Sequence, residues 1–128
     1  MASGKYEAYS QLILNYVFNG GSFAHAPTVS STGTEATGSG YARLTVACNT
    51  TNWPTISSTT TTITNNVAQT MATATGNWSS SSNQTDAGLW SASSSGTLYY
   101  WGDLATAKPI LSGDTASFAI SAITVQEL

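Results

Sequence analysis

The sequence predicts an all-β protein, an antiparallel β-sandwich or jelly roll with one short α-helix near its N-terminus. Short segments that alternate apolar and polar residues recur at the spacing typical of sandwich strands, and turn residues separate them. Helical periodicity occurs only near the N-terminus, so nothing supports the crossover helices of a parallel sheet. The 128 residues fit one domain, 1–128, with a helix at 5–18, a loop at 22–40 and a β-sandwich at 41–128.

The helix at 5–18 is predicted from apolar residues at steps of three and four, which place them on one face. These residues are Tyr6, Tyr9, Ile13, Tyr16 and Val17. Gly20 and Gly21 can stop the helix beyond that point. A helix of about four turns is marginally stable alone, so it must cover the open end of a sheet or pack against a partner subunit.

The rest of the chain divides into strands and turns. Residues 22–40 are small, polar and rich in glycine, which predicts a long loop with one short strand at most. Residues 41–49 alternate, with Ala42, Leu44, Val46 and Cys48 on the inward side. Further strands are predicted in the threonine run at 59–64, in a hairpin of 87–92 and 97–101, and at 115–127.

Charged residues make up only 7% of the chain, against roughly 25% in an ordinary soluble domain. Serine and threonine, 19 and 21 in number, account for 40 of 128 residues, or 31%. Three scattered cations cannot neutralise a run of phosphates, so we expect no nucleic-acid partner. No apolar run approaches the roughly 18 residues of a membrane span, and no signal peptide is evident, so we expect no membrane partner.

The ionisable residues form no pattern typical of a catalytic or metal site. The six carboxylates are widely separated, and those in Gly102-Asp103 and Gly113-Asp114 fit turns in which Asp binds its own backbone. His25 is the single histidine and Cys48 the single cysteine, too few for a metal cluster, a proton relay or an intrachain disulfide. We therefore expect no catalytic residue, no metal and no cofactor.

The aromatic residues of the predicted hairpin leave three interpretations open. They are Trp90, Tyr99, Tyr100 and Trp101. They can form ordinary sheet core, a contact between subunits, or a platform on which a sugar stacks. Strand alternation places Tyr99 and Trp101 on the face opposite Tyr100, so one face belongs to the core and the other is available for contact.

Arg43 stands on a predicted strand in a chain that is almost free of charge. Such a residue is either a surface arginine or has a dedicated acidic partner. The candidate partners are Asp114, Glu35 and Asp103, within one subunit or between subunits.

From residue 35 onward the chain resembles a family of small bacteriophage virion proteins, capsid cement or decoration proteins that are often labelled tail-fibre proteins. The motifs that carry the resemblance are Glu35-Ala36-Thr37-Gly38-Ser39-Gly40-Tyr41-Ala42-Arg43, Ala72-Thr73-Ala74-Thr75-Gly76-Asn77-Trp78, Ala87-Gly88-Leu89-Trp90-Ser91-Ala92 and Gly96-Thr97-Leu98-Tyr99-Tyr100-Trp101-Gly102-Asp103-Leu104. Lys108, Gly113-Asp114-Thr115 and Phe118 extend it, and Phe18-Asn19-Gly20-Gly21 resembles the end of the family's opening helix.

This resemblance implies a homotrimer that stabilises the phage head by bridging subunits of the major capsid protein. It implies a place on the outer surface of the capsid, after assembly in the cytoplasm of the bacterial host. The low charge suits that role, because few ionic groups need to be desolvated in a wide contact. The candidate interface residues are Tyr9, Ile13, Tyr16, Val17, Arg43, Trp90, Tyr99 and Trp101.

Two other functions compete with the cement prediction. The chain can be a tail-fibre or adhesin component that binds a host surface glycan through the aromatic residues between 90 and 101. It can also be a small glycan-active enzyme, which the scattered carboxylates make the weakest of the three. Particle stability tests the first function, and a glycan screen with purified protein tests the other two.

Overall fold

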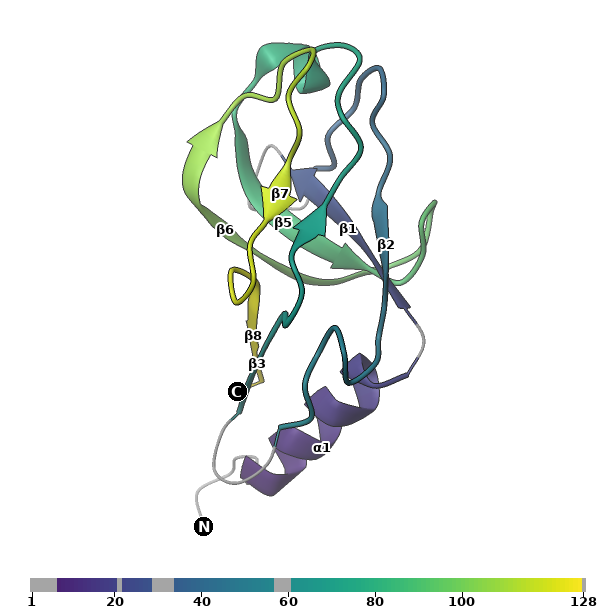
Figure 1. Cartoon of the computed structure of the whole chain (residues 1–128), viewed down its shortest axis with the longest axis vertical. Helices are drawn as coiled ribbons and strands as arrows, with labels where there is room; N and C mark the ends of the chain where they lie inside the picture. Colours follow the sequence, from purple (N-terminus) through teal and green to yellow (C-terminus); the bar gives the residue numbers. More distant parts are fainter. Residues whose placement is uncertain (1–6, 21, 29–33, 57–60, 128) are drawn as a thin grey trace. The chain divides into compact units, whose positions relative to one another are not determined.

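The computed structural model describes residues 7–20, 22–28, 34–56 and 61–127, and Figure 1 shows that their regular secondary structure is mostly strands, with one short helix. The predicted all-β class is therefore confirmed. The described strands form small sheets of four, two and two strands, and the predicted sandwich or jelly-roll arrangement is not confirmed. The chain forms two compact units. The helix unit comprises Met1–Ser22, Ala47–Ala68 and Phe118–Leu128, and the sheet unit comprises Phe23–Val46 and Gln69–Ser117.

In the helix unit, α1 spans Glu7–Phe18. Residues 5 and 6 of the predicted helix lie outside the described residues. Ser10, Leu14 and Phe18 form its buried face, at the four-residue spacing that aligns side chains along a helix. The ring of Phe18 packs on Trp53 with centroids 4.7 Å apart, and the side chain of Asn15 exchanges two hydrogen bonds with the backbone of Ile56. The helix is thus fixed by both apolar and polar contacts.

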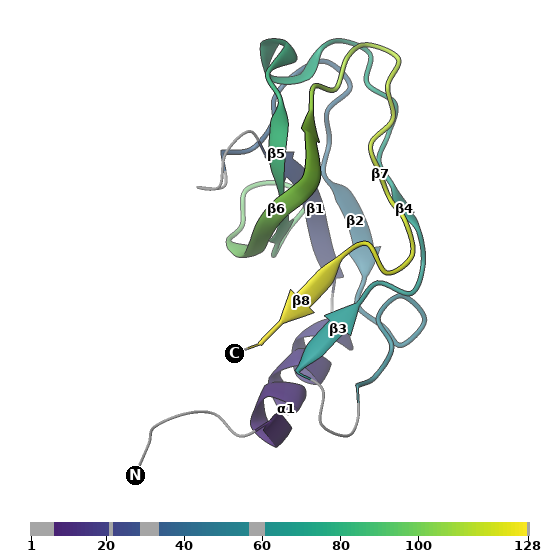
Figure 2. The ribbon, with the colours of Figure 1, turned by 90° about the vertical axis from the view of Figure 1, so that its left-hand side faces the viewer.

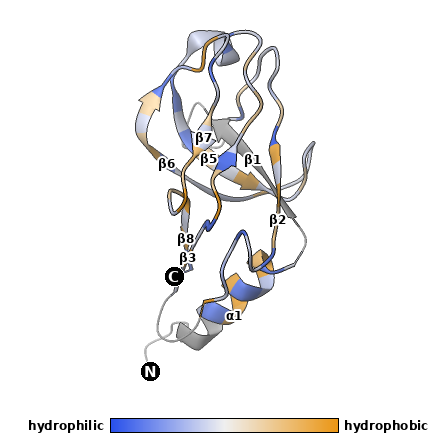
Figure 3. Cartoon of the chain, viewed as in Figure 1, coloured by the Kyte–Doolittle hydropathy of each residue, from blue (hydrophilic) through white to orange (hydrophobic). Residues whose placement is uncertain are grey.

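The apolar stripe predicted on α1 is not the face that packs within the helix unit. Tyr16 is 85% exposed, and Ile13 and Val17 are half-buried, whereas the side chain of Tyr9 lies outside the described part of the chain. Leu14 and Phe18, four residues apart, form a second apolar row that the predicted stripe does not include. Figure 3 shows hydrophilic and hydrophobic bands following each other along the α1 ribbon. Apolar residues therefore lie on more than one face of the helix, with Leu14 buried and Leu12 exposed.

Two short strands complete the helix unit. β3 (Thr62–Thr64) pairs with β8 (Thr124–Gln126), and Ile63 and Val125, which lie opposite each other, are both buried. The single strand predicted at 115–127 is wrong, because a turn separates β8 from β7 (Ser117–Phe118). The buried side chain of Asn65 fixes this turn by donating to the carbonyl oxygen of Ala119 and accepting from the amide of Ile123.

The sheet unit is built on a four-stranded sheet in the order β2 (Leu44–Ala47), β1 (Ser22–Thr28), β5 (Gln84–Trp90) and β6 (Leu98–Lys108). Figure 2 shows β5 and β6 running side by side, with β6 at the edge. The segment 22–40, predicted as a loop with one short strand at most, contains β1 in its first seven residues. Small residues and a proline gave β1 a weak strand signal, but its pairing with β5 overrides that local preference.

The core of the sheet unit is a cluster of buried side chains: Ala36, Met71, Ala74, Trp78 and Ile110. Tyr41 packs edge-on against Trp78, with ring centroids 5.0 Å apart at 87°. Trp78 opens a short 3-10 turn, η1 (Trp78–Ser81), and β4 (Gln69–Thr70) pairs with β7. This cluster supports the segment that carries Glu35, Tyr41 and Arg43. No helix in the described part of the chain is long and apolar enough to cross a membrane.

Candidate functional site

The predicted hairpin of 87–92 and 97–101 is confirmed and is longer than the sequence indicated. β5 and β6 are antiparallel, with Gly88 opposite Trp101 and Leu89 opposite Tyr100, and the register shifts between Leu89 and Trp90. β6 continues without interruption to Lys108. The turn predicted at Gly102-Asp103 is therefore wrong, because both residues lie inside β6, whereas Gly113-Asp114 does form a turn in which Asp114 accepts a hydrogen bond from the amide of Leu111.

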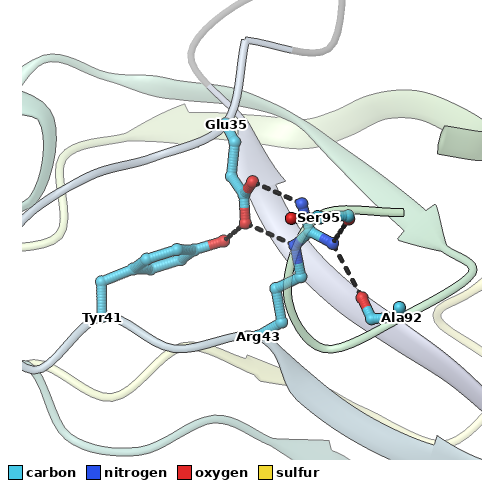
Figure 4. A network of polar contacts seen from close by, with 5 residues as sticks. All are labelled: Glu35, Tyr41, Arg43, Ala92 and Ser95. Atoms are coloured by element: carbon cyan, nitrogen blue, oxygen red, sulfur yellow. Dashed lines mark hydrogen bonds and ion pairs between the residues drawn. The ribbon is translucent and has the colours of Figure 1, made fainter. Parts of the chain in front are cut away.

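Arg43 joins the loop of this hairpin to an acidic partner, as Figure 4 shows. Its Nε and Nη2 atoms donate to the two carboxylate oxygens of Glu35 at 2.6 and 2.7 Å. Its Nη1 atom donates to the carbonyl oxygens of Ala92 and Ser95 at 2.7 and 2.6 Å. The hydroxyl of Tyr41 also donates to Glu35. Of the three predicted partners of Arg43, Glu35 is the one observed.

Burial strengthens these contacts, because the Arg43 side chain is 6% exposed and that of Glu35 is 25% exposed. The hydrogen bond and charge of Arg43 hold the pKa of Glu35 below its usual value, while Glu35 raises the pKa of Arg43. Burial, aided by the bond to Glu35, raises the pKa of Tyr41 well above its usual range. All three groups therefore keep one protonation state around neutral pH, as a structural clamp requires.

We call the contacts of Arg43 with Glu35 and the hairpin loop the clamp. Trp90 lies against Arg43 of this clamp and is half-buried. The guanidinium carbon of Arg43 is 4.0 Å from the centroid of the Trp90 ring, a cation–π contact. On the sheet side, a Cβ atom at Gly88 would lie 2.8 Å from Leu98 Cδ1 and 3.0 Å from Trp90 Nε1. The indole thus fills the space over Gly88 and is covered by Arg43, which makes Trp90 a packing residue.

Tyr99 and Trp101 differ from Trp90, because they are 55% and 53% exposed. Tyr100 between them is half-buried, so the predicted alternation of the three residues is confirmed. Trp101 lies opposite Gly88, which offers it no side chain, and the space over Gly88 is filled by Leu98 and Trp90. The edge position of β6 leaves no further strand of this sheet beside Trp101 within the described residues. The hairpin therefore presents two large aromatic side chains to solvent.

The remaining interface candidates, Tyr9, Ile13, Tyr16 and Val17, belong to α1 in the helix unit. Their part in a subunit contact stays a prediction. Sequence reasoning missed two buried polar residues of β5, Gln84 and Asp86. Their alternation with Thr85 and Ala87 was the available signal, but it runs against the usual rule that the apolar side of a strand faces inward. Among the described residues no group of three or more His, Cys, Asp and Glu side chains could hold a metal.

A family model described as Podophage GP4 fiber I protein gp80 matches residues 7–126. The chain belongs to this family. It is accordingly a bacteriophage virion protein, as its resemblance to phage virion proteins implied. The family's description as a fibre protein fits the tail-fibre alternative better than the capsid cement prediction. No curated protein matches the chain significantly.

Proposed function

We propose that this member of the podophage fibre family is a non-catalytic fibre component that binds a host surface glycan through Tyr99 and Trp101 of β6. The observation that carries the proposal is the exposure of these two rings on an edge strand, more than half of each side chain being open to solvent. The fibre description of the family supports the same function.

The chemistry of the two rings suits a sugar ligand. One face of a pyranose ring is lined by C–H groups and packs on an aromatic face, while the hydroxyl groups and the polar edge of Tyr or Trp stay hydrated. Residues two apart on a strand are spaced by about 6.5 Å, so the two rings can contact successive parts of a glycan chain.

The hairpin also holds the rings in place before any ligand arrives. Arg43 ties its loop to Glu35, and Trp90 packs between Arg43 and the sheet. Binding then requires little ordering of the backbone, which lowers the entropic cost of association.

The decisive experiment compares Trp101→Ala with Ile120→Ala, which removes an exposed apolar side chain outside the hairpin. Phage carrying Trp101→Ala should adsorb to host cells at least tenfold less, and purified Trp101→Ala protein should lose binding to host polysaccharide. Ile120→Ala should leave both properties unchanged. Normal adsorption and normal polysaccharide binding by Trp101→Ala would contradict the proposal.

A capsid cement protein would affect the stability of the particles and not their adsorption to host cells. If the chain bridges major capsid protein subunits as a homotrimer, particles without it lose resistance to heat, and adsorption is unaffected. Localising the chain by electron cryo-microscopy of whole particles separates the two, since density at the tail supports the fibre function and density over the capsid supports cement.

A further inference from the structure

Two carboxylates lie directly opposite each other in the β5–β6 ladder. Asp86 of β5 is the register partner of Asp103 of β6. In an antiparallel pair, opposite residues project from the same face of the sheet, with Cβ atoms roughly 4.5–5.5 Å apart, and like charges at that separation repel each other. The sequence alone hides this pair, because Asp103 appears to belong to a turn.

Asp86 is 1% exposed, yet its carboxylate is only partly satisfied. Its Oδ2 atom accepts a hydrogen bond from the hydroxyl of Thr85, whereas Oδ1 is buried and has no hydrogen-bond partner among the described residues. The ion pair of Arg43 with Glu35 does not involve Asp86. Buried carboxylates in proteins are normally paired with a cation or coordinate a metal.

Gln84 adds a third oxygen two residues before Asp86, and both side chains lie on the buried face of β5. The register shifts between these two residues, so Gln84 lies opposite Lys108 of β6 and not next to Asp103. It is also 1% exposed. Its Nε2 atom donates to the carbonyl oxygen of Ser82, which leaves Oε1 buried and without a partner in the described residues. The unsatisfied atoms of Gln84 and Asp86 are therefore both oxygen acceptors, and a ligand that satisfies both must be a donor or a cation.

We propose that Asp86, Asp103 and the amide oxygen of Gln84 bind a divalent cation of the calcium type. Calcium takes six to eight oxygen ligands from carboxylates, amides and water in flexible geometry, and a site with oxygen donors alone disfavours zinc and copper. A double positive charge balances the two carboxylates and removes their repulsion. Asp103 is exposed, so the ion enters from solvent and water completes its coordination.

The site does not depend on the proposed glycan function, although Asp103 lies only two residues beyond Trp101 on β6. It can therefore be tested with calcium chloride alone. The informative variant is Asp103→Asn, because this exposed residue can be changed without disturbing the core. Asp114→Asn is the matched control, since it removes the same charge while the asparagine oxygen can still accept the hydrogen bond from Leu111.

Calorimetric titration and thermal unfolding of the full chain, stripped with chelator and then supplied with calcium chloride, measure the site. At about 100 times the dissociation constant, calcium should raise Tm by roughly 5–10 °C in the parent chain and in Asp114→Asn. Asp103→Asn should lose most of this rise, and its calcium affinity should fall at least tenfold. No rise in the parent chain at millimolar calcium, or an equal rise in Asp103→Asn, would overturn the proposal.

Discussion

The β5–β6 hairpin carries two tryptophans in different surroundings, Trp90 at its packing end and Trp101 at its contact end. Trp90 is half-buried, packs over Gly88 and is covered by the guanidinium group of Arg43. Trp101 lies across the ladder from Gly88 and is 53% exposed. Both residues are tryptophans on paired strands, but one stabilises the hairpin and the other is presented by it.

The difference arises from what the neighbouring strands supply. At the packing end, Arg43 forms an ion pair with Glu35 and donates two hydrogen bonds to carbonyl groups of the hairpin loop. The Trp101 end lies on the edge strand, beyond which the described sheet has no further member. One of the three cations of the chain, Arg43, thus lies at the packing end, whereas the contact end exposes the aromatic ring of Trp101.

The largest expected effect comes from removing the clamp. Arg43→Ala leaves Glu35 partly buried without its cation and two loop carbonyl groups without a donor, so the free energy of unfolding should fall by about 3–4 kcal/mol. Arg43→Lys keeps the charge but not the forked geometry and should lose about 2 kcal/mol. Urea denaturation measures both, and a loss below about 1 kcal/mol in Arg43→Ala would show that the clamp is not a stabilising element.

The next effect separates the two tryptophans directly. Trp90→Ala removes a packed indole and the cation–π contact, so the free energy of unfolding should fall by about 2–3 kcal/mol. Trp101→Ala, at an exposed position, should change it by no more than about 0.5 kcal/mol. Equal losses in the two variants, measured by urea denaturation at one protein concentration, would contradict the division between a packing end and a contact end.

Local sequence patterns predict much of the difference between the packing end and the contact end of the hairpin. The hairpin, the exposure of Tyr99 and Trp101 against Tyr100, and Glu35 as a candidate partner of Arg43 follow from strand periodicity and from the scarcity of charge. These features depend on spacing along the chain, or on a choice among very few ionic groups. Local pattern is sufficient in such cases.

The missed features depend on pairing between segments. One short strand was allowed within 22–40, but its position was not predicted, because β1 has small residues and a proline and becomes a strand through its pairing with β5. Asp103 follows a glycine and looks like a turn residue, but β6 continues through it and places it opposite Asp86. The different surroundings of Trp90 and Trp101 depend on the strand register at Gly88 and on the position of the Arg43 side chain. The alternation of residues along one strand predicts neither.

A smaller effect concerns the pH dependence of the clamp. Arg43 lowers the pKa of folded Glu35 below its ordinary value of 4.5, so the stabilisation is present above that value and is lost as the pH falls through the lowered pKa. Glu35→Gln, which cannot ionise, serves as the reference. The stability advantage of the parent chain over Glu35→Gln should shrink in urea denaturation as the pH is lowered from neutral to well below 4.5. A constant advantage over that range would mean that the Glu35 charge does not stabilise the fold.

The smallest expected effect lies in the loop that the clamp holds. Ser95, whose carbonyl oxygen accepts from Arg43, has a φ of 54°, which a side chain disfavours. Ser95→Gly should therefore raise the free energy of unfolding by about 0.5 kcal/mol, since relief of strain exceeds the entropy that glycine adds to the unfolded chain. Gly96→Ala is the opposing control. Its φ is 76° and an added Cβ would lie 2.7 Å from Ser91 Oγ, so it should lower stability by about 1–2 kcal/mol. Urea denaturation of both variants beside the parent chain measures these opposite changes.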